Sequence, residues 1–147
     1  MLENFKIITY HYVRDKSKIY PYLNILSKNK FHKQIKYLIS KKKILAPDEI
    51  HYRIKNNIKF KSNEYWLTFD DGYKEHYNFV IPLLDKYKIK ASFYPANIDN
   101  QIAKVMNVNK VQFILSIFKN KKELFSEIKN IYLKKNNLIS FNNLIHK

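Results

Sequence analysis

Apolar positions along the chain fall into two repeating patterns, short strand-like runs and longer helix-like spacings. The strand-like runs, rich in β-branched and aromatic residues, cover residues 5–13, 64–70 and 90–95. Helix-like spacings of three and four cover residues 31–42, 73–87 and the region from 108 onward. Strands joined by helical crossovers lie parallel in one sheet. The pattern therefore predicts an α/β fold, with the helix over 73–87 bent where Pro82 interrupts it.

Two adjacent carboxylates, Asp70 and Asp71, end the second strand-like run directly before Gly72, the only glycine among 147 residues. A glycine used once marks a position that needs backbone freedom or the close approach of another segment. Asp-Gly also favours a tight hairpin turn, which stays open as an alternative. A hairpin needs an alternating strand next, and a helical pattern follows instead. The segment is therefore predicted to be a strand, an acidic turn and a helix.

The two carboxylates are candidates for catalysis because of where they stand. In α/β folds, chemically active groups sit where strands end, at the carboxyl edge of the sheet. Two neighbouring carboxylates repel each other unless a cation joins them. In one arrangement they divide the work: one binds a metal ion, and the other accepts a proton from the metal-bound water.

Residues 68–73 (TFDDGY) resemble the first motif of the polysaccharide deacetylases with a NodB-type domain, carbohydrate esterase family 4. The similarity continues in 82–87 (PLLDKY) and 91–94 (ASFY), and more weakly in 9–13 (TYHYV). The resemblance implies the N-terminal portion of a distorted (β/α) barrel of the glycoside hydrolase/deacetylase type. Residues 1–147 are then a single, incomplete domain of this kind.

This resemblance also implies an activity, the hydrolysis of N-acetyl or O-acetyl groups of a surface glycan in carbohydrate metabolism. By the same resemblance, Asp70 is the general base and Asp71 a ligand of a divalent metal ion, zinc. Tyr73 and His11 would line the groove that binds the acetylated polysaccharide.

The chain also departs from the family pattern. The family holds its metal with one aspartate and two histidines of a later H-x-x-x-H motif, and here only His146 follows His76. The later motifs with a substrate-binding arginine and a catalytic histidine are missing as well. Two interpretations stay open: the chain stops before the second half of its barrel, or it is a degenerate, inactive member that keeps a glycan- or protein-binding role. Whether the chain is an enzyme is left open, and weak or absent activity is expected. An incomplete barrel edge would favour self-association.

The histidines have simpler explanations than catalysis. His11 ends the first strand, and a buried structural histidine explains it as well as one facing the cleft. His76 is interpreted as an exposed or capping residue of the helix, and a position facing the mouth of the site stays open as the alternative. The other histidines lie among Lys, Gln and Asn and are interpreted as surface residues: His32, His51 and His146.

The net charge of +16 suggests nucleic-acid binding at first sight. Of the 28 basic residues, however, all but Arg14 and Arg53 are lysines spread along the chain, and arginine is preferred for forked phosphate and base contacts. No nucleic-acid partner is therefore expected. The chain has no apolar run of membrane-spanning length, no leader-like N-terminus and no cysteine, so the expectation is a cytoplasmic protein without a membrane span.

Overall fold

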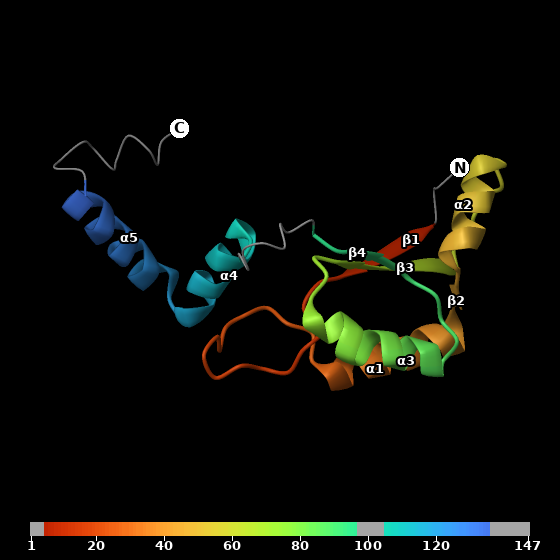
Figure 1. Ribbon diagram of the computed structural model, residues 1–147, viewed down its shortest axis with the longest axis horizontal. Helices are drawn as coiled ribbons and strands as arrows, with labels where there is room; N and C mark the ends of the chain where they lie inside the picture. The colour runs from red at the N-terminus through yellow and green to blue at the C-terminus, as the bar shows by residue number, and fades with distance from the viewer. Residues whose placement is uncertain (1–4, 97–104, 136–147) are drawn as a thin grey trace. The chain divides into compact units, whose positions relative to one another are not determined.

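The computed structural model describes residues 5–96 and 105–135 (Figure 1). They divide into two compact units. The first lies within residues 1–16 and 25–104, and the second within residues 17–24 and 105–147. The candidate site lies entirely in the first unit.

A parallel sheet forms the centre of the first unit, with β3 (Glu64–Asp70) as its middle strand. On one side, β1 (Lys6–Tyr10) pairs along β3, from Lys6 opposite Tyr65 to Tyr10 opposite Phe69. On the other side, β2 (Lys43–Ile44) pairs with the start of β3, and β4 (Ser92–Tyr94) pairs with its end. All pairs are parallel, so the α/β prediction is confirmed and the carboxyl ends of β1, β3 and β4 meet at one edge.

Helices cover one face of this sheet, with α1 (Lys28–Lys41) and α3 (Ile81–Lys86) lying side by side against it (Figure 1). The side chain of Ser27 caps α1 by accepting a hydrogen bond from the backbone N–H of Lys30. Buried residues of the sheet and both helices form one core. Its fully covered members include Phe31, Ile35, Leu67, Phe69 and Val80. Burial of these apolar side chains against the sheet is what holds β3, and hence the acidic turn, in place.

The helix predicted over 73–87 is interrupted, but the interruption lies before Pro82 and not at it. A single π-helical turn, η1 (His76–Val80), precedes α3, and the N–H of Ile81 bonds to the carbonyl of His76. Pro82 lies in the first turn of α3, where its missing N–H is not needed.

The π-turn changes which side chains face the core. In an α-helix, Tyr77 would share the face of Val80, three residues later, but Tyr77 is 76% exposed. A turn closed by i→i+5 bonds holds more residues than an α-turn, so a residue three positions before Val80 leaves the face of Val80, while a residue four positions before it stays there. His76, Val80 and Leu84 are accordingly buried. The interpretation of His76 as an exposed or capping residue is therefore wrong.

At the other end of β3, an ion-pair cluster anchors α2 (Pro47–Lys55) to the sheet. Arg53 donates to the buried carboxylate of Glu64 across 2.9 Å and also pairs with Glu49. The backbone N–H of Lys61 donates to the same Glu64 carboxylate. Burial by itself raises the pKa of Glu64, but this N–H and the guanidinium of Arg53 outweigh burial and lower that pKa below its usual value.

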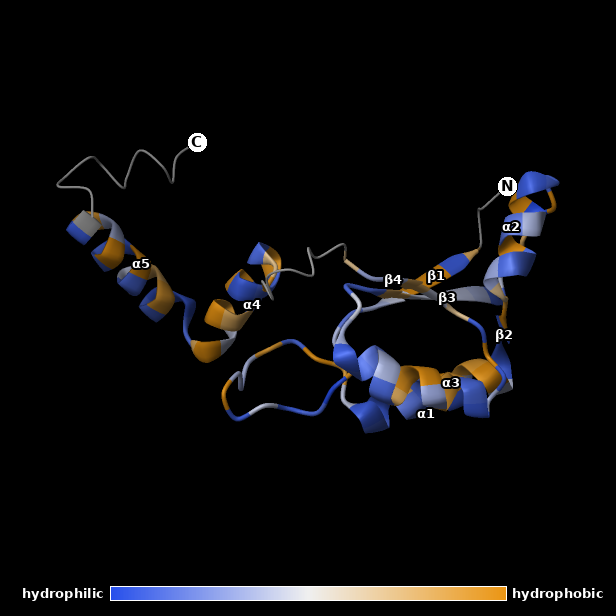
Figure 2. Ribbon diagram, in the orientation of Figure 1, coloured by the Kyte–Doolittle hydropathy of each residue, from blue (hydrophilic) through white to orange (hydrophobic). Residues whose placement is uncertain are grey.

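The second unit contains α4 (Asn107–Ile117) and α5 (Lys121–Lys135), as the helical pattern from residue 108 predicts. Within this unit, the ring of Tyr20 stacks on Phe113 at 4.6 Å, and the N–H of Tyr22 donates to the carbonyl of Ser116. Figure 2 shows apolar stretches along both helices, and many of their apolar side chains are exposed. No helix in residues 5–96 or 105–135 is long and apolar enough to cross a membrane.

Candidate active site

The acidic pair stands at the carboxyl edge of the sheet, where the sequence predicted it. Asp70 is the last residue of β3 and lies opposite Tyr94 of β4. The chain then turns through two left-handed residues, Asp71 (φ 71°) and Gly72 (φ 64°), into the helical segment. The predicted strand, acidic turn and helix are confirmed, and the hairpin alternative is wrong, because a π-turn and an α-helix follow.

Gly72 meets both requirements that a unique glycine suggests. Its positive φ disfavours any residue with a Cβ. A Cβ placed there would also lie 2.9 Å from Cβ and 3.0 Å from Cα of Pro95, the residue that follows β4. The loop after β3 thus touches the loop after β4, which brings two strand ends together at the site.

An aromatic and charged cluster orients Asp71. The hydroxyl of Tyr73 donates to Oδ2 of Asp71 across 2.7 Å. The ring of Tyr73 stacks on Tyr12 at 4.4 Å. The guanidinium of Arg14 lies over both rings, 4.7 Å from the centre of Tyr12 and 5.3 Å from that of Tyr73, and its Nε donates to Glu75. Tyr73, expected to line a sugar groove, is half-buried beside Asp71.

His11 follows β1 and lies beside the other carboxylate. Its Nε2 is 3.7 Å from Oδ2 of Asp70. Both side chains are open to solvent, His11 at 51% exposure and Asp70 at 35%. Of the two interpretations left open for His11, a buried structural role does not hold, since the ring stands at the open edge next to Asp70.

His76 is hydrogen-bonded to the backbone at the carboxyl edge of the sheet. Its Nε2 lies 2.7 Å from the carbonyl oxygen of His11, and because a carbonyl can only accept, Nε2 carries the proton and donates. Its Nδ1 is buried without a hydrogen-bond partner among the described residues. The ring packs edge-on against Phe69 and Tyr73. The spacing of four residues from His76 to Val80 and on to Leu84 is the signal in the sequence that places His76 on the buried face.

The remaining histidines lie away from the site. His32 is half-buried and shares a 2.8 Å hydrogen bond with the hydroxyl of Tyr87, so its assignment to the surface is wrong in part. His51 is exposed, as expected. His146 lies outside the described residues.

The side chains at the site do not fit a complete metal centre. Catalytic zinc usually has three protein ligands and an open position for water. Within residues 5–96 and 105–135, no three His, Cys, Asp or Glu side chains come close enough together to hold an ion. Among these described residues, Asp71 therefore lacks the two further ligands that the resemblance assigns to the metal site.

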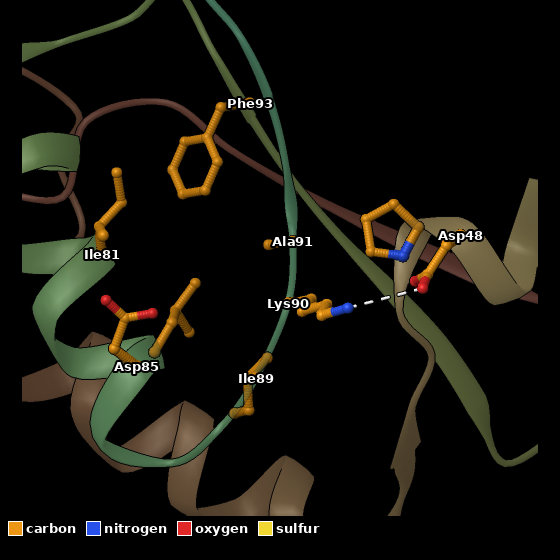
Figure 3. A pocket seen from close by; sticks show the side chains of 9 residues that line it. Asp48, Ile81, Asp85, Ile89, Lys90, Ala91 and Phe93 are labelled. Atoms are coloured by element: carbon orange, nitrogen blue, oxygen red, sulfur yellow. Dashed lines mark ion pairs between the residues drawn. The ribbon is translucent and has the colours of Figure 1, made fainter.

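A separate cavity of about 500 Å³ lies between α3 and β4 (Figure 3). Neither Asp70 nor Asp71 lines it. Its walls are mostly apolar, with Ile81, Leu84 and Phe93 among them. On one side, Lys90 pairs with Asp48 across 3.5 Å. The cavity is open to solvent, and its two carboxylates, Asp48 and Asp85, do not stand together as Asp70 and Asp71 do, since Asp48 is paired with Lys90.

Comparison with known proteins agrees with this geometry. The family model for polysaccharide deacetylases matches residues 57–125, which include β3, the acidic turn and β4. Among curated proteins, no sequence matches the chain.

Three solved structures share the fold. A de-N-acetylase from Aggregatibacter actinomycetemcomitans is 23% identical, with a TM-score of 0.55 over 70% of this chain and 43% of its own. IcaB from Ammonifex degensii is 25% identical, with a TM-score of 0.56 over 71% and 42%. The Streptococcus pyogenes deacetylase PplD, solved with acetate, is 24% identical, with a TM-score of 0.57 over 76% and 51%. The match thus spans about half, or less, of each of these proteins. Residues 57–125 thus match part of a polysaccharide deacetylase domain, and the described chain shares its fold with solved deacetylases.

Proposed function

We propose that this chain is part of a metal-dependent polysaccharide deacetylase, namely the part that carries the acidic pair. The proposed reaction removes N-acetyl or O-acetyl groups from a surface glycan. One observation carries the proposal. Asp70 and Asp71 stand at the carboxyl edge of a parallel sheet, on a turn held by Gly72 and Tyr73, inside the residues that match the family. Because the match spans about half, or less, of each solved relative, the whole activity is proposed and not assigned.

In this proposal Asp70 is the general base. Its carboxylate is open to solvent at the end of β3, where it can accept a proton from the water that attacks the acetyl carbonyl. His11, beside Asp70, and Tyr73, beside Asp71, are proposed to contact the glycan. The bond that breaks is the one between the acetyl carbonyl carbon and the sugar nitrogen or oxygen, and acetate is released.

Asp71 is proposed as one ligand of a divalent cation, zinc by resemblance. The hydroxyl of Tyr73 occupies Oδ2, which leaves Oδ1 for the ion. The described residues supply no set of three ligands, so the others would have to come from elsewhere. We therefore expect this chain by itself to bind zinc weakly and to release little acetate.

The sheet is proposed to be the N-terminal portion of a distorted (β/α) barrel. Parallel sheets are ordinarily covered on both faces, yet the helices of this unit cover one face only (Figure 1). The other face holds hydrogen-bonded polar side chains, Thr68 to Thr9 at 2.9 Å and Trp66 to Ser92 at 3.0 Å. A polar surface of this kind suits the interior of a barrel that further strands would close. Where the barrel is not closed, the uncovered sheet favours self-association of the isolated chain.

A non-catalytic role is the second candidate. The incomplete ligand set favours it, because a chain that keeps the fold and the substrate edge without a metal centre can bind a glycan or another protein but not hydrolyse an acetyl group.

Calorimetric titration of zinc, combined with an acetate-release assay on an N-acetylglucosamine oligomer, separates the two candidates. Asp70→Asn and Asp71→Asn are compared with Asp85→Asn, an exposed carboxylate of α3 away from the acidic turn. A small acetate release with weak zinc binding, which both site variants abolish and Asp85→Asn leaves intact, supports the deacetylase. Oligomer binding without zinc binding or acetate release supports the non-catalytic role.

A further inference from the structure

We infer that Arg14 is a positioning residue for the acidic turn, which holds the ring of Tyr73 and, through its hydroxyl, the carboxylate of Asp71. The inference rests on the proposed function in one respect, which is that Asp71 is the proposed metal ligand. The contacts that carry it are independent of any metal or substrate.

Arg14 reaches the turn through two kinds of contact. Its guanidinium lies over the stacked rings of Tyr12 and Tyr73, and its Nε donates to the carboxylate of Glu75. Only 13% of the Glu75 side chain and 32% of the Arg14 side chain are exposed. A charge-assisted bond at this degree of burial is stronger than a surface ion pair, and it fixes the plane of the guanidinium.

The backbone of Arg14 is itself immobilised. The N–H of Arg14 donates to the carbonyl of Leu26, and the N–H of Leu26 donates to the carbonyl of Tyr12. Between these two bonds, Val13 forms a parallel bridge with Leu26 and is fully buried. The segment after β1 is therefore a fixed support from which the Arg14 side chain extends to the acidic turn.

The turn needs such a support because it is strained. Asp71 is a non-glycine residue at a φ of 71°, directly before a second left-handed residue. Residues in this region persist where the surroundings hold them. The bond from the Tyr73 hydroxyl to Oδ2 fixes the direction of the Asp71 side chain, and the ring of Tyr73 is in turn fixed by Tyr12 and Arg14.

The choice of arginine supports this role. The chain has 28 basic residues, and only Arg14 and Arg53 are arginines. Arg53 also bonds carboxylates, those of Glu49 and Glu64. Lysine can pair with a carboxylate but lacks the planar group that stacks on rings while it donates sideways. Arg14→Lys should therefore keep the charge and lose the geometry.

The composition provides a direct reporter. Because Gly72 is the only glycine, a chain labelled with ¹⁵N-glycine gives one backbone amide resonance, located next to Asp71. In Arg14→Lys and in Glu75→Gln, we expect this resonance to shift and broaden and to acquire microsecond-to-millisecond relaxation dispersion. Arg53→Lys, the same substitution at the other end of β3, should leave it unchanged. Far-ultraviolet circular dichroism checks that each variant is folded.

A double-variant comparison tests the route through Tyr73. If Arg14 acts on the turn through Tyr73, then Arg14→Lys should add no further shift once Tyr73→Phe has removed the hydroxyl. Tyr77→Phe, an exposed neighbour, is the control for loss of a hydroxyl. An unchanged Gly72 resonance in folded Arg14→Lys and Glu75→Gln would overturn the inference, and so would fully additive shifts in the double variant. These results do not depend on zinc or acetate, so failure of the proposed function would be seen separately.

Discussion

The imidazole Nε2 of His76 donates to the backbone carbonyl oxygen of His11, 65 residues earlier in the chain and 2.7 Å away. This bond joins the π-turn after the acidic pair to the end of β1. It fixes the backbone at His11, which follows β1 directly and lies beside Asp70.

Loss of this bond should destabilise the fold. His76→Ala removes a buried ring and its hydrogen bond, and it should lower the free energy of unfolding by about 1–3 kcal/mol. Urea denaturation measures the change. Tyr77→Ala, at the exposed neighbouring position, should change it by less than about 0.5 kcal/mol. Equal losses for the two variants would contradict the burial of His76 and the exposure of Tyr77.

An added methyl group at Gly72 should be costly. Gly72→Ala combines a positive φ with a contact to Pro95, and it should lower the free energy of unfolding by about 1–3 kcal/mol. Asn57→Ala is the matched control, because Asn57 has a similar φ of 55° but already carries a Cβ. If thermal or urea denaturation gives the two variants the same cost, then the approach of Pro95 does not contribute.

Glu64 should make stability depend on pH in the acid range. Its pKa is lowered in the folded state, so its contribution is present above the ordinary pKa of a glutamate and is lost as the pH falls through the folded-state value. Glu64→Gln should therefore flatten the acid side of the curve of unfolding free energy against pH. Glu127→Gln, an exposed carboxylate, should leave the curve as it is.

Substitution of Arg53, the ion-pair partner of Glu64, should destabilise the fold more strongly. Arg53→Met would leave the buried charge of Glu64 without the guanidinium that pairs with it. The substitution should lower the free energy of unfolding by about 3–5 kcal/mol near neutral pH. Combining it with Glu64→Gln should recover part of the loss. Additive costs for the two substitutions in urea denaturation would contradict the coupling.

The uncovered face of the sheet should promote association of the isolated chain. Ile7 on β1 is 54% exposed there. Sedimentation velocity over a range of concentrations should show self-association, and Ile7→Thr should reduce it while keeping a β-branched residue in the strand. Ile58→Thr, which alters an exposed isoleucine outside the strands, is the control. A monodisperse monomer at every concentration would contradict the prediction.

The sequence by itself determined the local order of the site. The apolar run, the two carboxylates and the unique glycine predicted a strand, an acidic turn and a helix, and the structure has them in that order. Such features depend on neighbouring residues and on backbone freedom, which a local pattern records. The same motif was enough to indicate the family.

Only the tertiary structure decided what surrounds that turn. The contact of Gly72 with Pro95, the Arg14 and Glu75 pair and the bond from His76 to His11 join residues 23 to 65 positions apart, and no local pattern records such distances. His76 shows the reason most clearly. A helix of ordinary period places both His76 and Tyr77 on the face of Val80, whereas the π-turn before Pro82 turns Tyr77 out to solvent and keeps His76 buried. The phase of a helix depends on every turn before it, so one altered turn changes which side chains support the site.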